Sequence, residues 1–180
     1  MASILNVDSI RNAAGTSAIT IDSNGRVAMG NTVEIDMWRL PSAFSTNSAI
    51  INTWTRPTST GTARAGTGMT HSSGYFTFPS TGLYRFSLSF RMFLISSDTS
   101  AGINVLLSTD GGSSTTPIAG AYENRNSNSS CHTQGLINVT DVSNFQMSFQ
   151  TSSISSGGYV SGHSDRNETS IIFERITDSQ

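Results

Sequence analysis

The sequence predicts an all-β fold, an antiparallel sandwich or barrel preceded by a short β-hairpin arm. Apolar side chains recur with a period of two, most clearly at residues 84–90, whereas an amphipathic helix would show a period near 3.6. Loops rich in Gly, Ser and Asn separate these short runs at regular spacing. The sequence contains no heptad pattern, so we expect no coiled-coil shaft.

The chain divides into an N-terminal arm, residues 1–30, and a main domain, residues 31–180. Within the arm, Asn24-Gly25 stands between two alternating segments, which is the strongest short-range signal for a β-hairpin. An isolated hairpin is only marginally stable, so the arm must pack on the main domain, on sister chains or on a partner protein. The apolar side chains that we expect to dock the arm are Leu5, Val7, Ile10, Ile19, Ile21 and Val27.

The main domain reads as a series of short strands separated by polar loops. In the first strand, three apolar residues alternate with Glu34, Asp36 and Trp38. We expect loops at residues 55–68 and 123–130, which are rich in small and polar residues. The expected strands lie at residues 33–38, 49–54, 75–78, 84–90, 103–107, 136–139, 145–150 and 170–176.

The segment from residue 74 to residue 90 is the most informative part of the domain. Aromatic and small polar residues alternate on both sides of Pro79-Ser80-Thr81-Gly82, which predicts two half-buried strands that meet at a tight corner. Burial of a large apolar side chain contributes roughly 1.5–3 kcal/mol, so we expect these side chains to anchor the core. After the corner, the residues that share one face are Tyr84, Phe86, Leu88 and Phe90.

This segment resembles the globular-head domain of the complement subcomponent and its relatives in the tumour necrosis factor superfamily. The family pattern is a Gly, a short aromatic strand, a Pro, a second Gly and two alternating aromatic residues. The matching residues here are Gly74, Phe76, Pro79, Gly82, Tyr84 and Phe86. The resemblance extends over about residues 40–177, with this one specific motif and weaker agreement elsewhere.

The resemblance implies an antiparallel β-sandwich of the jelly-roll type, with ten strands, that assembles as a compact homotrimer. Members that bind calcium place acidic ligands near the apex of the trimer, and no equivalent residues are identified here, so we infer no metal site. The sequence leaves open which aromatic residues face the threefold axis. The residues expected in the core or at the trimer interface are Tyr75, Phe76, Phe78, Gly82, Tyr84, Phe86, Phe90 and Phe173.

The N-terminal segment is similar to the leader segments of structural proteins from tailed phages, particularly marine and cyanobacterial ones. The similar positions lie in Ser3–Asp8, Asn12–Thr16 and Thr20–Val27. In those proteins the leader precedes various C-terminal modules, as expected of a docking segment. The two resemblances together imply a virion protein, made in the host cytoplasm, with a docking arm and a trimeric knob.

Composition excludes several other classes of function. The net charge is −2 and the ten basic residues are scattered arginines, so there is no basic stripe for nucleic acid. No apolar run approaches the roughly 20 residues of a membrane-spanning helix, and we see no secretory signal. The single Cys131 cannot form an intrachain disulfide.

We expect no catalytic residues, no metal and no cofactor. His71, His132 and His163 each lie in a polar segment, and their spacing does not bring them together, so we interpret them as loop histidines. Cys131 lacks a positioned base, since its neighbour His132 would point to the opposite face of a strand. Asp110-Gly111-Gly112 is typical of a hairpin turn rather than a calcium loop, which would need further acidic ligands.

A charged cluster remains as a possible contact with a partner. It comprises Asp165, Arg166 and Glu168, and the alternative interpretation is a solvated loop. Three sequons for N-glycosylation also occur, as expected by chance in a chain so rich in Ser and Thr.

The sequence therefore favours a non-enzymatic virion protein, a homotrimeric capsid decoration or cement protein or a short head fibre. Its partners would be other copies of itself and the major capsid protein or another virion protein. The second hypothesis is a tail-fibre tip or tail adaptor that recognises a host-surface receptor or glycan through the loops at residues 55–68, 108–117 and 123–130. A third, a glycan hydrolase, would need convergent carboxylates, and the twelve acidic residues are spread thinly.

Overall fold

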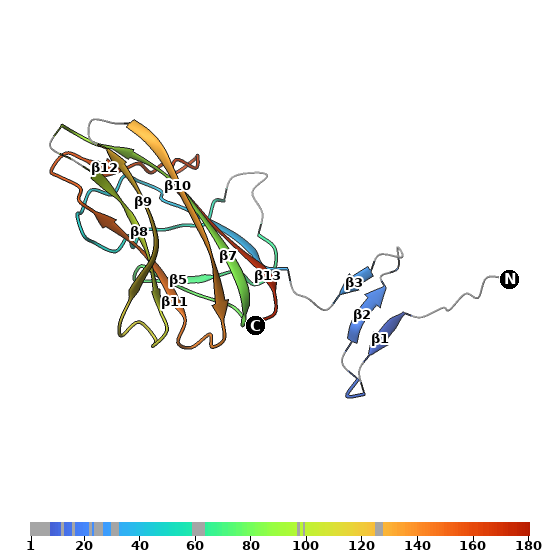
Figure 1. Ribbon diagram of the computed structural model, residues 1–180. Helices are drawn as coiled ribbons and strands as arrows, with labels where there is room; N and C mark the ends of the chain where they lie inside the picture. Colours follow the sequence, from blue (N-terminus) through green and yellow to red (C-terminus); the bar gives the residue numbers. More distant parts are fainter. Residues whose placement is uncertain are drawn as a thin grey trace. The chain divides into compact units, whose positions relative to one another are not determined.

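The computed structural model describes residues 8–11, 13–15, 17–21, 23, 27–29, 33–58, 64–96, 98, 100–124 and 128–180. The chain separates into two compact units, residues 1–32 and residues 33–180 (Figure 1). Each unit is described below by itself.

The N-terminal unit is a small antiparallel sheet with the strand order β1-β2-β3. Ile21 pairs with Val27, so β2 and β3 form the hairpin predicted around residues 24–25. Ser9 pairs with Thr20, which adds β1 on the other side of β2. The strands are β1 (Ser9–Arg11), β2 (Ser17–Ile21) and β3 (Val27–Met29).

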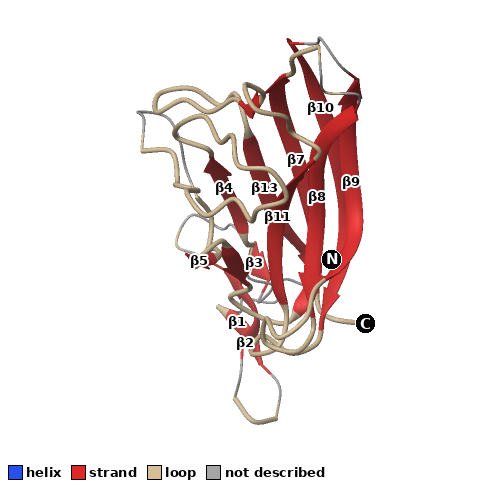
Figure 2. Ribbon diagram, turned by 90° about the vertical axis from the view of Figure 1, so that its left-hand side faces the viewer, coloured by secondary structure: helices blue, strands red, loops and turns tan. Residues whose placement is uncertain are grey.

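The second unit is an antiparallel β-sandwich of two five-stranded sheets in the described part of the chain (Figures 1 and 2). One sheet has the order β10-β7-β13-β4, with β12 also paired to β7, and the other has the order β5-β6-β11-β8-β9. No helix occurs among the described residues, and the all-β antiparallel prediction is confirmed. The strands are β4 (Ile35–Arg39), β5 (Thr70–Ser72), β6 (Tyr75–Thr77), β7 (Gly82–Phe93), β8 (Ser100–Ser108), β9 (Thr116–Asn124), β10 (Asn128–Val139), β11 (Gln146–Ser152), β12 (Tyr159–Val160) and β13 (Ser170–Thr177).

The core of the sandwich is built from aromatic rings contributed by both sheets. Phe76 of β6 lies at its centre, with ring centroids 5.1 Å from Phe173 of β13 and 5.8 Å from Phe149 of β11. Trp38 and Trp54 close the cluster in edge-on contact with Phe76. These tilted and edge-to-face arrangements are the preferred geometry of aromatic pairs, so the packing gains more than area burial alone.

The corner at residues 79–82 carries the chain from one sheet to the other. β6 pairs with β5 and β11, whereas β7 pairs with β10 and β13. Gly82 has a φ of +153°, and a Cβ there would lie 2.8 Å from the carbonyl oxygen of Thr177, so only glycine fits. The Tyr84 hydroxyl donates a hydrogen bond to the Ser80 carbonyl at 3.0 Å, which fixes the exit from the corner.

In β4 and the two residues before it, the acidic residues face the core and the aliphatic residues face outward, which is the reverse of the usual arrangement. Glu34 and Asp36 are buried, while Val33 and Ile35 are exposed. Usually the apolar set of an alternating strand faces the core. The reversal is possible because a loop that lies far away in the sequence supplies partners for both carboxylates.

That loop precedes β5, and its amides converge on the two acids. Gly68 donates its N–H to Glu34 at 2.7 Å, and Met69 donates its N–H to Asp36 at 2.8 Å. Arg56 adds a two-pronged contact to the Asp36 carboxylate, with Nε 2.9 Å from Oδ1 and Nη2 2.9 Å from Oδ2. Buried carboxylates with this many donors are satisfied, so the acids hold the loop against the core.

Five elements differ from the expected strand series. β5, β9 and β12 were not predicted, and residues 49–54 contain only an isolated bridge from Ile50 to Gln150 instead of a strand. The expected polar loop at residues 123–130 is wrong in extent, because β9 continues to Asn124 and β10 already begins at Asn128. Both strands are solvent-exposed over much of their length, so they carry no alternating apolar pattern to reveal them.

Candidate functional site

The outward side of the β10-β7-β13-β4 sheet carries apolar side chains that nothing in the described chain covers. We call these residues the outer apolar patch. Four of them are 40–61% exposed and two are half-buried beside them. The patch consists of Val33, Ile35, Leu136, Ile176, Met37 and Ile172.

The pairing of the strands places these side chains in rows across the sheet. Leu136 lies opposite Arg85, which lies opposite Glu174, and Glu174 lies opposite Ile35. Arg85 donates its Nε hydrogen to Glu174 at 2.6 Å, so the charges in the middle of this row neutralise each other. A shallow cavity of about 360 Å³ opens on the patch between Leu136 and Ile176. An exposed apolar area of this kind is typical of a protein–protein contact.

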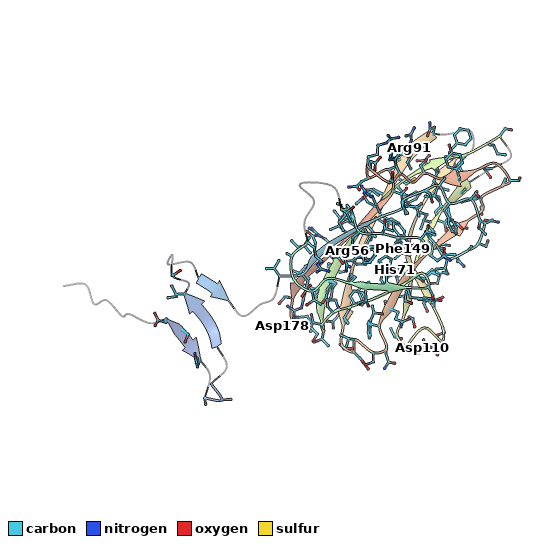
Figure 3. All side chains as sticks on the ribbon, turned by 180° about the vertical axis from the view of Figure 1, so that it is seen from behind. Arg56, His71, Arg91, Asp110, Phe149 and Asp178 are labelled. Carbon is cyan, nitrogen blue, oxygen red and sulfur yellow. The ribbon has the colours of Figure 1, made fainter. Side chains whose placement is uncertain are left out.

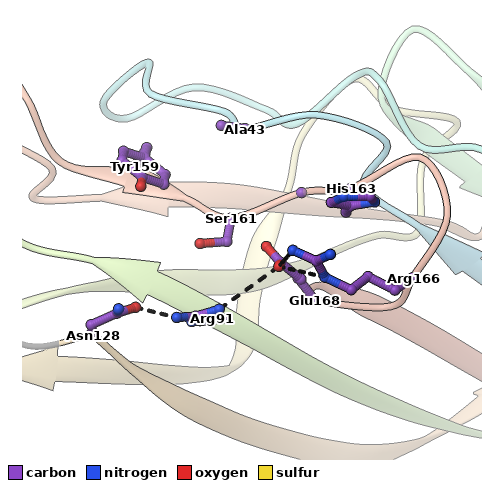
Figure 4. Close-up of a pocket in the computed structure, with 9 residues that line it drawn as sticks. Ala43, Arg91, Asn128, Tyr159, Ser161, His163, Arg166 and Glu168 are labelled. Atoms are coloured by element: carbon purple, nitrogen blue, oxygen red, sulfur yellow. Dashed lines mark hydrogen bonds and ion pairs between the residues drawn. The ribbon is translucent and has the colours of Figure 1, made fainter.

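A second, polar cavity lies toward the opposite end of β7. Figure 3 shows Arg91 at one end of the domain, and Asp178, two residues beyond Ile176, at the other. The cavity has a volume of about 380 Å³, and we call it the arginine pocket (Figure 4). Its polar lining comes from β7, β10 and the segment between β12 and β13, and includes Arg91, Asn128, Ser161, His163, Arg166 and Glu168.

Two arginines share one carboxylate in the arginine pocket. Arg166 donates from Nε at 2.9 Å and from Nη2 at 2.7 Å to a single oxygen, Oε1 of Glu168. Nη1 of Arg91 lies 3.7 Å from the same oxygen, and Nε of Arg91 donates to Asn128 Oδ1 at 2.9 Å. The hydrogen bonds from Arg166, together with the charges of both arginines, hold the pKa of Glu168 below its usual value. Two guanidinium groups against one carboxylate leave the pocket positively charged.

The predicted core residues lie inside the sandwich. Phe76, Phe78, Tyr84, Phe86, Phe90 and Phe173 are all buried in the core of a single chain. Gly82 is also buried, at the corner, while Tyr75 is half-buried on β6. The structure therefore places these aromatic rings between the two sheets, and the outward apolar residues are a different, aliphatic set.

The predicted docking residues of the arm lie partly outside the described residues. Leu5 and Val7 fall there, and Val27 begins β3. Ile10 is 51% exposed on β1, and Ile19 and Ile21 of β2 are half-buried.

The interpretation of the histidines as loop residues is wrong for two of the three. His71 lies on β5, and its ring centroid is 4.6 Å from that of Phe76 and 5.6 Å from that of Trp38. Its Nε2 is buried without a hydrogen-bond partner among the described residues, and burial lowers its pKa. His132 lies on β10, where Nδ1 is 3.1 Å from the Ser89 hydroxyl. The three histidines do not come together.

Other candidate chemistry has a structural explanation. The Cys131 thiol donates to Glu123 at 3.1 Å, and burial together with that carboxylate raises its pKa to about 12, so it is a poor nucleophile. Asp110 accepts hydrogen bonds from the hydroxyls of Ser108 and Ser114 in the β8–β9 hairpin, and these bonds lower its pKa to about 2. Within the described ranges, no three His, Cys, Asp or Glu side chains are grouped to hold a metal ion. No helix there could cross a membrane.

The sequence analysis identified only part of the arginine pocket. It singled out Asp165, Arg166 and Glu168 as a charged cluster, and two of these three line the cavity. Arg91 and Asn128 come from β7 and β10, and only the pairing of those strands brings them to the cluster. No local sequence signal connects these positions.

Comparison with solved structures gives many matches. Murine APRIL aligns with a TM-score of 0.59 and 14% sequence identity, over 80% of this chain and 99% of that one. Eiger TNF from S. frugiperda aligns with a TM-score of 0.63 and 10% identity, over 83% of this chain and 96% of that one. The fold is a TNF-like jelly roll. No sequence family and no curated protein sequence matches the chain.

The TNF-like jelly roll confirms the predicted fold class. At 10–14% identity the likeness concerns the fold, and functional residues cannot be transferred along it. The outer apolar patch and the arginine pocket are thus features of this chain's own side chains on a shared framework.

Proposed function

We propose that this chain is a non-enzymatic structural protein that forms a homotrimer through the outer apolar patch of its TNF-like domain. The observation that carries the proposal is the exposure of that patch, with Leu136 61% and Ile176 51% exposed. Apolar side chains left on one face of a sheet gain free energy when a second surface covers them, and another copy of the chain is always available at equal concentration.

The geometry favours a ring over a symmetric pair. β9 and β10 border the same edge of the sandwich, and their side chains, such as Cys131 and Thr133, stay half-exposed even where they face inward. The open edge of one copy can therefore lie across the outer apolar patch of the next. Such head-to-tail contacts generate closed rings when the rotation between copies closes.

Sedimentation equilibrium tests the assembly. We expect a species of three times the 19.1 kDa chain mass. Leu136→Asp places a charge in the outer apolar patch and should shift the protein to monomers by at least tenfold in the association constant. The control is Thr70→Asp, at an exposed residue of β5, which lies at the edge of the other sheet opposite to β9, and it should leave the trimer intact. A monomeric parent chain, or equal effects of the two variants, would contradict the proposal.

We propose further that residues 1–30 attach the trimer to a phage particle as a capsid decoration or cement protein or a short head fibre. The resemblance of residues 3–27 to phage leader segments supports this. Thirty residues reach at most about 100 Å when fully extended, so an arm bound to the virion keeps the jelly roll close to the surface. Binding to the assembled shell would also stabilise it by mass action.

Electron microscopy of intact particles, labelled with an antibody against the jelly-roll unit, tests the location. Label on the head supports the capsid assignment, and label restricted to the tail overturns it. Co-sedimentation of the full chain with particles tests the arm. Ile10→Asp should weaken this binding, because Ile10 is 51% exposed, whereas Thr70→Asp on β5 should not.

The arginine pocket favours a second candidate, a tail-fibre tip or adaptor that recognises a glycan on the host surface. A concave site with a few convergent polar groups is typical of small-molecule recognition. If this candidate is correct, the purified protein should block adsorption of the phage to its host. A protein that binds particles and leaves adsorption unchanged would rule it out.

A further inference from the structure

We propose that the arginine pocket binds a carboxylate-bearing sugar, such as the hexuronic acid unit of an acidic glycan. The proposal rests on the second candidate above, glycan recognition by this pocket, and names the class of sugar; it does not depend on the trimer or on the attachment of the arm.

Guanidinium donors in the arginine pocket are free to bind an anion. In the described part of the chain, no hydrogen bond occupies Nη1 of Arg166 or Nη2 of Arg91. The two side chains are 65% and 40% exposed, so these donors are open to a ligand. Glu168 holds both guanidinium groups in place and neutralises only one of them. The pocket therefore presents an ordered, positively charged fork, the geometry that suits a carboxylate.

The arginine pocket also contains polar groups that can bind the hydroxyl groups of a sugar. Ser161 is 6% exposed and lines the cavity, and its hydroxyl has no hydrogen-bond partner among the described residues. His163 accepts the Asp165 N–H on Nδ1 at 3.0 Å, so the proton of its neutral ring is on Nε2, which is a second donor. Oε2 of Glu168 accepts no hydrogen bond within the described ranges. The Ser161 oxygen is not among the buried polar atoms without a partner, so it is accessible from the cavity, and a sugar offers both donors and acceptors to these groups.

The walls and the volume of the arginine pocket fit a sugar ring. Tyr159 lines the cavity, and its ring stacks on Phe93 with centroids 5.2 Å apart and planes 21° apart, which holds it in place. Figure 4 shows Tyr159 on one side of the cavity and Arg166 on the other, with Ser161 and Glu168 between them. An aromatic wall opposite charged and polar groups suits a ring with an apolar face and a polar rim. The volume of about 380 Å³ lies at the small end of ligand pockets and accommodates one sugar unit.

The experiment compares three ligands on the full chain by saturation-transfer difference NMR. Galacturonate carries the carboxylate and the hydroxyls, galactose carries the hydroxyls alone, and acetate carries the carboxylate alone. We expect galacturonate to bind at least tenfold more tightly than either of the other two. If galactose binds as tightly as galacturonate, the arginines do not contribute to binding. If acetate binds as tightly as galacturonate, the pocket recognises only the carboxylate and not the sugar. Either result, or no binding of galacturonate, overturns the proposal.

Two arginine variants locate the binding. Arg166→Gln should weaken galacturonate binding about tenfold or more, as expected for the loss of a charge-assisted hydrogen bond. The matched control is Arg85→Gln, which removes a guanidinium paired with Glu174 on the same face of the sheet and should leave binding unchanged. Equal losses in the two variants would mean that binding depends on overall charge, which contradicts the proposal.

The oligomeric state of each variant is measured in parallel. If Arg166→Gln dissociates the protein, the pocket is part of a contact between copies and the proposal fails. If Leu136→Asp dissociates the protein and galacturonate still binds, the pocket stands independently of the assembly, which supports the proposal.

Discussion

Asp36 is 2% exposed, and its carboxylate collects donors from three parts of the chain. Trp38 donates its indole N–H at 2.8 Å, Met69 donates its backbone N–H at 2.8 Å, and Arg56 donates from Nε and Nη2. The Arg56 guanidinium also lies 4.3 Å above the Trp38 ring. Because these partners come from separate segments, one side chain ties the loop before β5 to the core.

Asp36→Asn should lower the free energy of unfolding by about 2 kcal/mol, since the amide keeps the volume and loses the charge and one acceptor oxygen. Urea denaturation followed by tryptophan fluorescence measures the loss. Glu174→Gln is the matched control at the ion pair with Arg85, where both side chains are partly exposed, and it should cost less than about 1 kcal/mol. Equal costs at the two sites would contradict this account of Asp36.

His71 makes stability depend on pH. Burial lowers its pKa in the folded chain below the ordinary value of 6.5, which the unfolded chain retains. Between these two pKa values the unfolded chain binds the proton and the folded chain does not, so stability falls as the pH drops below 6.5.

Thermal unfolding at pH 5, 6, 7 and 8 measures this dependence. We expect Tm to fall toward pH 5 in the parent chain and to fall less in His71→Phe, which keeps an aromatic ring against Phe76 and has no proton to bind. An unchanged slope in His71→Phe would show that other groups cause the acid sensitivity.

The burial of Glu34, Asp36 and His71 could not be predicted from the sequence. The alternation around Glu34 and Asp36 was visible, but which set faces inward depends on amides of Gly68 and Met69, more than thirty residues along the chain. Likewise, nothing beside His71 in the sequence reveals that Trp38 and Phe76 enclose its ring. Local pattern specifies the strand, and distant contacts decide its burial.

At the scale of the elements, the fit between β10 and β7 depends on a missing side chain. Gly135 faces inward from β10, and a Cβ there would lie 2.6 Å from the ring of Phe86 on β7. The absent side chain leaves the space that the Phe86 ring occupies beside the neighbouring strand. The contact is a packing requirement of the two strands together, and it leaves no trace in the pattern of either one.

Gly135→Ala should destabilise the fold by roughly 1–3 kcal/mol, because an added methyl group forces the Phe86 ring out of its position. Combination with Phe86→Leu, which makes room, should cost less than the sum of the two single substitutions. Urea denaturation of the four members of this double-mutant cycle measures the coupling. Strictly additive costs would show that the ring and the glycine do not compete for the same space.

The elements that were predicted correctly share one property, a face packed on the core. β7 buries every second residue, and in β11 and the first half of β13 the buried apolar residues, Met147, Phe149, Ile171 and Phe173, also alternate in the sequence. β9 and the first half of β10 are exposed on one face and only half-buried on the other, where small or polar residues stand, and β5 and β12 are very short. Such strands are specified by pairing with their neighbours, which a single sequence does not display.

At the scale of the whole molecule, the fold class followed from one corner motif and the period of the strands, and the solved structures agree with it. The two surface sites could not be predicted from the sequence. The outer apolar patch combines residues from three strands and the segment before β4, and the arginine pocket combines four separated segments. Fold is encoded in patterns that repeat along the chain, whereas these sites exist only where the folded chain brings single residues together.

The outer edge of β9 has a consequence for how assembly stops. β9 is the last strand of its sheet, and an open edge of this kind is a template on which further strands can add. Here Pro117 has no N–H to offer, and the register shift between Val105 and Leu106 leaves Ile118 as an extra residue that bends the strand. The edge of β9 therefore opposes polymerisation by strand addition, and concentrated solutions should contain discrete particles instead of fibrils.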